Sequence, residues 1–468
     1  MSKVLLINLP FERMYEGTKL SAILHYSPPL SLAAVGASLL QDKNEVRVFD
    51  MNHAKNSLSR LAEEVMSMQP DFVGVTFVTA LFKEMLEVVR LIKGINKDII
   101  VIGGGPHVSS FPAATLNESG LDVGIIGEGD LNIREVVNRL PYQRIKGIVY
   151  RQNGSVIVNP RESFIKDLDS LPLPAYQLFD ITEYKISKTL SRFSPVAWLE
   201  SSRGCLYNCV YCNKTVHGNQ FRTKTPERVI EEMLWVKSLG FKEVHFADDA
   251  FTTDINRSKE ICDLIISKGI KLPWVLITGI RVNQVDAELF MKLKKAGCYR
   301  VAIGVESGNE QILKNIHKGI HLEQVERAVY WSKKAGVEIW GLFMISLPGE
   351  TEESMRDTIA FAKKLPFDLV KMSIMIPLPA TPIFNEWEAK KLIKTKDWSK
   401  FSFYSSPAEI YDHPDLSWDV IMKYYDNFYK GFYSNPSFIW RRFKSSIKNG
   451  TLLDDITCAL QMKWFNRN

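Results

Sequence analysis

Short apolar runs alternate with longer segments of helical periodicity over the first third of the chain. The runs are rich in β-branched residues and bounded by Gly, Asp or Pro, which is typical of buried parallel strands. They lie at 4–9, 46–50, 72–77, 99–104 and 123–127. The segments between them have apolar residues at helical spacing. Residues 1–140 are therefore predicted to form an α/β domain with a doubly wound, Rossmann-like (flavodoxin-like) sheet.

A second alternation begins near residue 196. Its strands are expected at 196–201, 243–247, 274–279, 300–305, 338–345 and 369–375, again separated by helical patterns. Six β/α units are too few for an eightfold barrel, so residues 191–390 are predicted to form a partial (βα)6 TIM-type barrel that is open on one side. Prolines in 167–180 indicate that residues 141–190 form a linker.

The C-terminal region, residues 391–468, is expected to be helical and is unusually aromatic. Between Trp398 and Asn468, 17 of 71 residues are aromatic, about twice the 11% of the whole chain. Basic residues are interleaved with them. The aromatic side chains are expected to be the core of a helical cap, with contact to a large apolar substrate or to a membrane surface as alternatives. Nucleic-acid binding is not expected, because basic residues do not dominate the region.

Composition limits the class of protein only broadly. No apolar run reaches about 18 residues, so no transmembrane segment is expected. The N-terminus lacks the features of a secretory signal. Six cysteines in 468 residues are not a disulfide framework. A cytoplasmic location is the resulting expectation, and the net charge of +6 says little about partners.

Three of the six cysteines form one cluster with C-x3-C-x2-C spacing, at Cys205, Cys209 and Cys212. The cluster follows the first expected barrel strand, so it lies in a loop at the catalytic face. Three thiolates on a four-iron cluster leave one iron open to a small molecule. The alternatives are a zinc site completed by His217 and a chance spacing of structural cysteines. The other three are expected to be buried apolar residues: Cys262, Cys298 and Cys458.

With Tyr211 before the third cysteine, the loop resembles the signature of the radical S-adenosylmethionine (SAM) family, C-x3-C-x-aromatic-C after the first strand of a partial barrel. The resemblance implies that Cys205, Cys209 and Cys212 hold a 4Fe–4S cluster. It also implies that SAM fills the open iron position. Reductive cleavage of SAM then yields methionine and a 5′-deoxyadenosyl radical, which abstracts hydrogen from an unactivated C–H bond.

The resemblance also places SAM contacts at the ends of the barrel strands. Two acids follow the second strand, although the family's more usual GGEP form is absent. An arginine after the third strand is a candidate for the SAM carboxylate, and GVESG after the fourth is placed for the ribose or amino group. The stretch 376–382 could stack on adenine. The SAM-binding candidates are Tyr211, Asp248, Asp249, Arg281, Glu306 and Ser307.

Two glycine-containing loops follow strands of the first domain, GGGPHVS at 103–109 and GEGD at 127–130. Glycines at strand ends let a large ligand approach the backbone, although neither loop is a nucleotide-binding motif. Together with the barrel, this domain resembles the cobalamin-binding subclass of the family, which includes hopanoid and antibiotic-pathway methylases and an anaerobic cyclase of bacteriochlorophyll synthesis. The implied cobalamin contacts are Thr76, Val78, Thr79, Gly104, Gly105, His107, Glu128 and Gly129.

One departure concerns the cobalt ligand. Many cobalamin domains carry D-x-H-x-x-G, but here His53 is displaced by one position after Asp50 and no glycine follows. Members of the subclass commonly lack the motif and leave cobalt without a protein imidazole, so His53 is expected to be a loop residue. A sheet that has lost its cofactor is the alternative.

The resulting functional expectation is methyl transfer to an unactivated carbon of a biosynthetic intermediate, through methylcobalamin and a 5′-deoxyadenosyl radical. A radical oxidative cyclase or rearrangement enzyme without methyl transfer is the first alternative. An iron–sulfur binding or electron-transfer protein is the second, and it is disfavoured because an open iron is a poor closed redox centre. The expected partners are a small, apolar substrate and an electron donor such as flavodoxin or ferredoxin.

Overall fold

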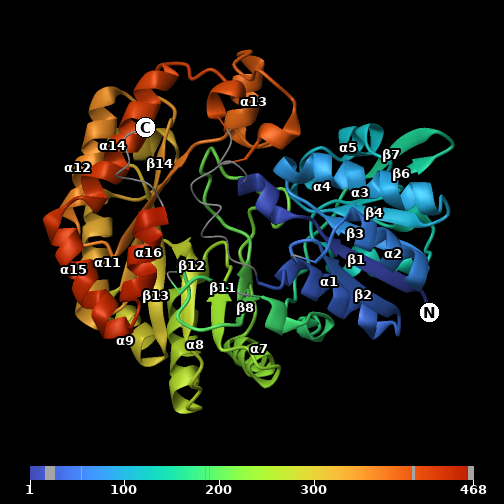
Figure 1. Ribbon diagram of the computed structural model, residues 1–468, viewed down its shortest axis with the longest axis horizontal. Coiled ribbons are helices and arrows are strands. Elements are labelled where there is room, and N and C mark those ends of the chain that lie inside the picture. The colour runs from blue at the N-terminus through green and yellow to red at the C-terminus, as the bar shows by residue number, and fades with distance from the viewer. Residues whose placement is uncertain (16–26, 54, 185, 189, 403–405, 462–468) are drawn as a thin grey trace.

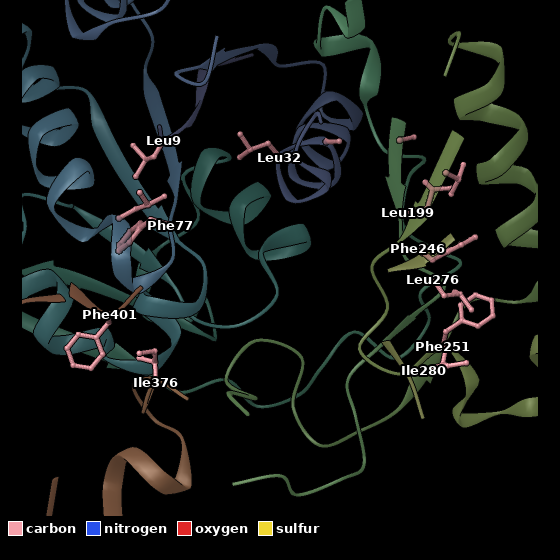
Figure 2. Packing of buried hydrophobic residues seen from close by; sticks show 14 of the residues in the cluster. Leu9, Leu32, Phe77, Leu199, Phe246, Phe251, Leu276, Ile280, Ile376 and Phe401 are labelled. Carbon is pink, nitrogen blue, oxygen red and sulfur yellow. The ribbon is translucent and has the colours of Figure 1, made fainter. Parts of the chain in front are cut away.

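The computed structural model describes residues 1–15, 27–53, 55–184, 186–188, 190–402 and 406–461. Two β-sheets, built mainly or entirely of parallel strands and each with its own helices, lie side by side (Figure 1). Helices from the C-terminal region cover one side of the second sheet. Buried apolar side chains fill both halves, from Leu9, Leu32 and Phe77 in the first to Leu199, Phe246 and Leu276 in the second (Figure 2). The site described below lies where the two halves meet.

The first sheet has seven strands in the order β2-β1-β3-β4-β5-β6-β7. The strands are β1 Lys3–Asn8, β2 Glu45–Asp50, β3 Phe72–Thr76, β4 Ile100–Gly104, β5 Val123–Ile125, β6 Ile148–Gln152 and β7 Ser155–Asn159. The first five are parallel, and the order reverses between β1 and β3. Ligands of doubly wound sheets bind at the carboxyl ends of the strands beside such a reversal. The five parallel strands and the reversal of their order confirm the predicted doubly wound sheet.

The last two strands form a hairpin that was not expected from the sequence. β6 pairs with β5 and β7 with β6, both antiparallel, so the sheet continues past residue 140 into the stretch expected to be a linker. The hairpin turns at Asn153 and Gly154, both with positive φ (50° and 79°). Asn-Gly is the characteristic pair of a tight hairpin turn. The Asn-Gly pair is visible in the sequence, but the prolines in 167–180 favour the prediction of a linker for this stretch.

Helices cover both faces of the first sheet. They are α1 Leu30–Gln41, α2 Leu58–Met68, α3 Phe82–Ile95, α4 Pro106–Ser110, α5 Pro112–Glu118 and α6 Gly129–Val137. α1 packs beside α6, and α2 packs beside α3. α2 begins where the Ser57 hydroxyl accepts a hydrogen bond from the Arg60 amide, which satisfies one of the free N–H groups of its first turn.

The second sheet has six parallel strands in the order β15-β14-β13-β12-β11-β8. They are β8 Val196–Leu199, β11 Glu243–Phe246, β12 Trp274–Ile280, β13 Cys298–Glu306, β14 Glu338–Ile345 and β15 Leu369–Ile374. Their helices are α7 Pro226–Ser238, α8 Ile255–Ser267, α9 Ala287–Lys295, α10 Glu310–Asn315, α11 Leu322–Ala335 and α12 Glu352–Lys364. Within the described residues β8 and β15 do not pair with each other. The predicted partial barrel, open on one side, is confirmed.

The C-terminal region is helical as expected, with α13 Pro382–Ala389, α14 Trp418–Tyr433, α15 Pro436–Asn449 and α16 Leu452–Gln461. Part of its aromatic content protects the free edge of the barrel. The Tyr433 hydroxyl is bonded to the backbone N–H and C=O of Val370 in the edge strand β15, at 3.2 and 2.8 Å, and Tyr429 does the same for Met372. An exposed strand edge is open to unwanted pairing, and these hydroxyls occupy it. Along the described chain, no helix has the length and apolar character needed to cross a membrane.

Candidate functional site

The three cysteines lie in a loop, residues 204–221, between the short strands β9 Ser202–Arg203 and β10 Arg222–Thr223. We call this segment the cysteine loop. It opens with Gly204 at φ +81°, where a Cβ atom would lie 2.0 Å from the Gln220 carbonyl oxygen. Only glycine fits such a close backbone approach at positive φ. The tight crossing brings the two ends of the loop together and fixes where Cys205 begins.

The three thiols are close enough to influence one another. Partial desolvation by surrounding protein atoms, followed by the neighbouring Cys209 and Cys205, raises the pKa of the Cys212 thiol to about 11, although part of Cys212 is open to solvent. The Cys209 sulfur lies 3.8 Å from the His317 carbonyl oxygen. Three thiols on one short loop are a donor set that fits an iron–sulfur cluster, whose irons would stabilise the thiolate form. In the described part of the chain, no group of three or more His, Cys, Asp or Glu side chains is gathered around one point suited to a single metal ion.

Tyr211 of the cysteine loop forms a polar group with Glu306 and Lys318, both of which are buried. Burial, followed by the charge of Glu306, raises the pKa of Tyr211 well above its usual range. The Lys318 ammonium lies 2.6 Å from a Glu306 carboxylate oxygen. Glu306 ends β13 with φ +64°, and a Cβ at Gly304 would lie 2.6 Å from its carboxylate and 2.7 Å from Lys318. Gly304 therefore leaves the room in which this ion pair forms.

Lys318 was not among the residues predicted from the sequence. It lies in the turn after α10, and nothing in its local sequence distinguishes it from a surface lysine. The same turn supports the cysteine loop, because Val210 N–H donates to the Ile316 carbonyl at 3.2 Å. The structure thus brings Glu306 and Tyr211 together as candidates and adds a cation to them.

The two acids after β11 hold the cysteine loop in place. Asp248 is buried and accepts hydrogen bonds from the Ser201 amide and from the Ser201 and Ser202 hydroxyls, at 2.5–3.1 Å. Burial raises its pKa to about 6, opposed by these donors. Asp249 accepts from the Gly204 amide at 2.9 Å and lies 3.0 Å from His217 Nδ1.

Both carboxylates are therefore occupied by protein donors. His217, the residue that would complete a zinc site, is bound to Asp249 in this arrangement.

Arg281 and Ser307 are also occupied by protein partners. The Arg281 guanidinium lies 3.3 Å above the centre of the Tyr207 ring and donates to the carbonyls of Lys318 and Gly319. Ser307 is fully buried, with its hydroxyl 3.1 Å from that of Thr358 in α12. The end of a strand identifies the correct loop, but it does not fix which way each side chain points.

The inner face of the barrel has partly accessible apolar side chains with charged or polar neighbours, such as Arg300 beside Trp340 and His245 beside Trp198. Along β14, Ile339 and Phe343 are buried against the helices, whereas Trp340 and Leu342 between them keep accessible surface. Because side chains alternate along a strand, the accessible set faces the interior of the barrel. Leu342 pairs with Gly304 in the register of β13 and β14. On other strands of the barrel, Trp198 of β8 and Ile277 of β12 are also partly accessible.

At the reversal point of the first sheet, three candidate cobalamin contacts lie at an open surface. Val78 is 38% exposed although it is apolar, and Thr76 is partly exposed. A Cβ built on Gly104 would have no heavy atom within 4 Å. An exposed valine beside open backbone at the carboxyl ends of β3 and β4 fits a large, partly apolar cofactor.

His107 and Thr79 lie in closed packing instead. His107 is 1% exposed, and its Nδ1 lies 3.2 Å from the Thr79 hydroxyl. Its ring is surrounded by Phe77, Phe82, Phe111 and Trp398, with ring centres 4.8–6.0 Å away. Burial lowers its pKa to about 4, so it is neutral near pH 7.

Trp398 lies in the 3₁₀ helix η9 Trp398–Lys400, far along the chain. The enclosure of His107 therefore could not be predicted from the sequence around it.

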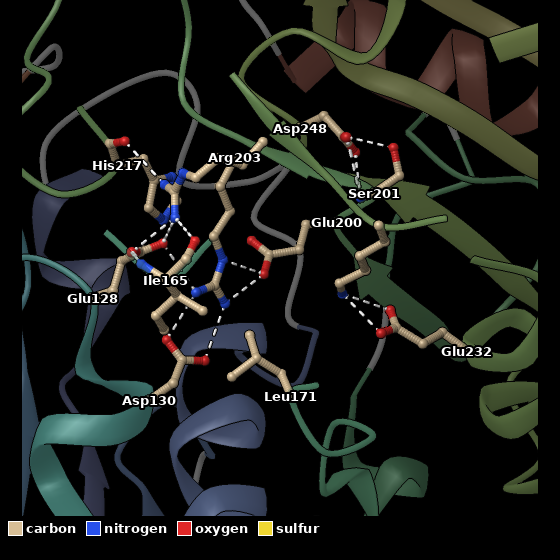
Figure 3. A network of polar contacts seen from close by, with 12 residues as sticks. Glu128, Asp130, Ile165, Leu171, Glu200, Ser201, Arg203, His217, Glu232 and Asp248 are labelled. Atoms are coloured by element: carbon tan, nitrogen blue, oxygen red, sulfur yellow. Dashed lines mark hydrogen bonds and ion pairs between the residues drawn. The ribbon is translucent and has the colours of Figure 1, made fainter. Parts of the chain in front are cut away.

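The GEGD loop joins the two halves of the molecule. Glu128 accepts hydrogen bonds from Arg222, from Arg203 and from the Ile165 amide. Arg203 also forms ion pairs with Asp130 and Glu200, at 2.9 and 2.6 Å (Figure 3). Glu128 is thus saturated by barrel residues, and Gly129 begins α6 behind it. Arg203 is two residues before Cys205, so this buried network couples the first sheet to the cysteine loop.

A second bridge involves Asn213, directly after the third cysteine. Its side-chain amide donates to the Ser110 hydroxyl in α4 at 2.9 Å and to the Pro379 carbonyl at 2.8 Å. Neither Asn213 nor Arg203 was a candidate from the sequence, because their partners are distant in the chain.

The remaining predictions concern His53 and the other cysteines. His53 lies in a bend, with its ring 4.8 Å from that of Tyr184 and its Nδ1 3.9 Å from a Glu183 carboxylate oxygen. Cys262 and Cys298 are fully buried, as expected. The side chain of Cys458 lies outside the described residues.

Comparison with known proteins gives two family matches. Residues 199–362 match the radical SAM superfamily, and residues 20–137 match the B12 binding domain. An uncharacterized methyltransferase of Pyrococcus horikoshii is 34% identical over 80% of this chain and 82% of its own length. The anaerobic magnesium-protoporphyrin IX monomethyl ester cyclase of Rubrivivax gelatinosus is 25% identical, over 88% and 75%. The fold is similar to that of the cobalamin-dependent SAM radical enzyme OxsB with aqua-cobalamin bound, with a TM-score of 0.74 and 19% identity over 98% of this chain and 72% of that one.

Proposed function

Because the chain belongs to the cobalamin-binding branch of the radical SAM superfamily, we propose that it transfers a methyl group to an unactivated carbon of an apolar small molecule. The observation that carries the proposal is the position of the cysteine loop. It is bonded to the first sheet by the Arg203 network and lies against the inner face of the barrel, so both cofactors and the substrate can meet there. The Pyrococcus relative, a methyltransferase by name, supports the type of reaction.

In this proposal the two halves hold different cofactors. Residues 1–140, extended by the hairpin of β6 and β7, form the cobalamin domain, and residues 191–390 form the radical SAM core. The stretch 141–190 links them, and residues 391–468 close the open side of the barrel. Cys205, Cys209 and Cys212 hold the 4Fe–4S cluster, while Thr76, Val78 and Gly104 contact cobalamin.

Bound together, the cluster, SAM and cobalamin supply a 5′-deoxyadenosyl radical and a methyl group carried on cobalt. The protein contributes position and environment. By the sign of their charges, the Lys318 ammonium is suited to the carboxylate of SAM and Glu306 to its amino group or ribose. Each would exchange its partner in the present ion pair for the group on SAM. Burial of this pair strengthens its electrostatic interactions by excluding water.

The inner face indicates the chemical class of the substrate. Trp198, Trp340, Ile277 and Leu342 are partly accessible apolar side chains of the barrel strands, and Leu342 pairs with Gly304, two residues before Glu306. Apolar and aromatic linings bind substrates chiefly by removing apolar area from water. A ring-containing or isoprenoid-like molecule fits this lining better than a highly charged one.

Two expected partners and the location are part of the same proposal. An electron donor such as flavodoxin or ferredoxin would approach near the exposed edge of the cysteine loop, where Leu206 is 54% exposed and Cys212 is exposed. The protein is proposed to act in the cytoplasm, and a membrane-surface contact of its C-terminal region is developed in the next subsection.

The first test concerns the cluster. Anaerobically reconstituted protein should contain four irons per chain and cleave SAM to 5′-deoxyadenosine when reduced. Cys209→Ala should lose both properties, because it removes a buried ligand. Cys262→Ala is the matched control, since its thiol is buried in α8 away from the loop. A cluster that survives Cys209→Ala would contradict the assignment.

The second test separates methyl transfer from cyclisation. Cyclisation is the second candidate because the Rubrivivax relative is a cyclase by name. Methyl transfer consumes two SAM molecules, one giving S-adenosylhomocysteine and one giving 5′-deoxyadenosine. With reduced cobalamin bound, the protein should form S-adenosylhomocysteine even in Cys212→Ala, which should make no 5′-deoxyadenosine. Turnover that yields 5′-deoxyadenosine without S-adenosylhomocysteine would favour the cyclase.

A further inference from the structure

Helix α15 exposes an apolar face that no described residue covers. Ile439, Trp440, Phe443 and Ile447 are 52%, 58%, 44% and 57% exposed. With 3.6 residues per turn, these four side chains fall within about 100° of the helix circumference. A helix packed on a globular protein normally turns its apolar stripe inward. Here the stripe faces water.

The opposite face of α15 holds the helix in place. Phe438 is buried against Phe432 and Tyr433, with ring centres 4.9 and 5.0 Å away. Arg442 forms an ion pair with Asp455 of α16, and the Asn449 amide donates to Glu338 at the start of β14. The apolar stripe is therefore not a misplaced core surface, because a second set of contacts already docks the helix.

Positive charge lies along one flank of the stripe. Lys444 and Lys448 are exposed one turn apart on the same helix, and the Lys444 ammonium lies 4.7 Å from the centre of the Trp440 ring. Both described acids of α16 have cationic partners, Asp455 in Arg442 and Asp454 in Lys188. Among the residues described in α15 and α16, large apolar side chains therefore combine with exposed lysines, and each acid has a cationic partner.

α16 extends the apolar surface beyond the turn at Gly450. Leu453 and Ile456 are 80% and 48% exposed. Of the large apolar side chains that the described chain exposes, six belong to this helical hairpin, which we call the α15–α16 face: Ile439, Trp440, Phe443, Ile447, Leu453 and Ile456. Contiguous exposed apolar surface with a polar border marks an interaction site.

We infer that the α15–α16 face docks the protein onto an anionic lipid bilayer, with the helices lying in the plane of the interface. Amphipathic surface helices combine bulky apolar side chains, which enter the interface, with lysines, which meet negative headgroups. Tryptophan is suited to the boundary between headgroups and acyl chains. A second copy of this chain is a poorer occupant, because the acids that the hairpin could offer to the lysines of a partner hairpin already pair with Lys188 and Arg442.

The binding test uses the full-length protein and vesicles in a flotation assay. Vesicles of phosphatidylcholine with about one third phosphatidylglycerol should carry the protein upward, and pure phosphatidylcholine should carry much less. Each lysine near a negative surface contributes about fivefold in binding. Lys444→Ala with Lys448→Ala should therefore weaken binding to the anionic vesicles by roughly 25-fold. Raising the salt from about 0.1 to 0.5 M should weaken wild-type binding as well, because screening shortens the reach of the charges.

A second variant removes the apolar anchors. Trp440→Ser with Phe443→Ser should reduce binding to anionic vesicles by at least about tenfold, because the protein loses two aromatic side chains that enter the lipid interface. Met66→Ser with Met291→Ser is the matched control, since these methionines are 56% and 53% exposed on other helices. It should bind like the wild type, and thermal melts should show that all variants are folded.

The inference does not rest on methyl transfer, and its outcomes are separate from those of the cysteine variants. Equal binding to neutral and anionic vesicles, or variants that bind like the wild type, would overturn it. So would a dimer in light scattering that Trp440→Ser with Phe443→Ser dissociates while vesicle binding is absent, because the face would then belong to a second copy. Removing residues 462–468 should leave binding in place; loss of binding on that truncation would assign it to the terminus instead.

Discussion

Replacing Arg203 by methionine should destabilise the protein strongly, because the side chain neutralises acids from both halves of the molecule. Its guanidinium contacts Glu128, Asp130 and Glu200 at 2.6–3.2 Å (Figure 3). The Arg203 side chain is only 5% exposed, and those of the acids are 3–12% exposed. Methionine fills a similar volume but leaves buried carboxylates without their main cation. Arg222 remains for Glu128 only.

The magnitude follows from the burial of the group. Removing one partner of a buried ion pair costs about 3–5 kcal/mol, since a charge is left without compensation. Unfolding of 468 residues carries an entropy of about 2.1 cal/mol/K per residue, or ~1 kcal/mol/K for the chain. The apparent melting temperature should therefore fall by about 3–5 °C. If the two halves unfold separately, the shift should appear in both transitions, because the network spans them.

Differential scanning calorimetry of the folded protein is the assay, with Arg60→Met as control. Arg60 also has a carboxylate partner, Glu63 at 2.7 Å, but both side chains are about 60% exposed. Exposed pairs contribute less than about 1 kcal/mol, so the control should melt within about 1 °C of the wild type. Arg203→Lys should recover only part of the loss, because one ammonium cannot reach three carboxylates in fork geometry.

The effect of pH gives an independent check. Burial alone would raise the pKa of Glu200, but the charges of Arg203, Lys224 and His217 outweigh it and lower the pKa to about 2. A lowered carboxyl pKa contributes stability that is present above the unfolded pKa and lost as pH falls through the folded one. In Arg203→Met the main charge that opposes burial is lost, so the variant's acids take up protons at a higher pH than those of the wild type. The difference in stability between wild type and Arg203→Met should therefore be largest near neutral pH and shrink as the pH falls through the carboxyl range. A variant that melts like Arg60→Met at every pH would refute the reasoning.

Two further changes test other buried polar groups. Tyr433→Phe should lower the free energy of unfolding in urea by about 1–3 kcal/mol, because it leaves the N–H and C=O of Val370 without their hydroxyl partner. Tyr330→Phe on the exposed face of α11 is the control and should lower it by less than about 0.5 kcal/mol. Equal losses in the two variants would argue against a capped strand edge. Burial raises the pKa of Glu350 to about 8, opposed by the amides of Leu347 and Ser346. The stability that this protonated carboxyl contributes is present below its unfolded pKa near 4.5 and is lost as the pH rises through 8. Between pH 5.5 and 8.5 the free energy of unfolding of the wild type should therefore fall relative to that of Glu350→Gln. Parallel pH profiles of the two proteins would contradict this.

The strands of both sheets could be predicted because buried parallel strands are nearly continuous apolar runs. Their parallel arrangement could be predicted from the alternation with helices. The hairpin of β6 and β7 was missed for a local reason, since its strands have only five residues each and the prolines that follow its Asn-Gly turn favour a linker. The cysteine loop could be predicted because three thiols at this spacing, after a barrel strand, are typical of an iron–sulfur cluster with one open iron.

Side-chain direction was the part that the sequence could not supply. Asp248 and Ser307 lie at strand ends, where ligands bind, yet both point into closed protein contacts. Glu128 is taken by Arg203, 75 residues away, and His107 is enclosed by Trp398 from beyond the barrel. Such pairings depend on how two sheets and a C-terminal segment pack together. Local sequence does not encode that packing, so strand-end position predicts the loop and not the contact.

The missed residues explain how the two halves act as one unit. Arg203 and Asn213 flank the three cysteines, and each is bonded both to the first sheet and to the barrel side. The stretch from Cys205 to Cys212 is therefore fixed on both sides by contacts that cross the boundary, and a shift of one half would move the cysteines. Reactions between bound groups lose rate steeply when reacting atoms are displaced by about 1 Å. Under the proposed function, methyl transfer between bound cofactors and a substrate requires such precise placement. The buried ion network would hold the residues proposed to bind each cofactor at a fixed distance from one another.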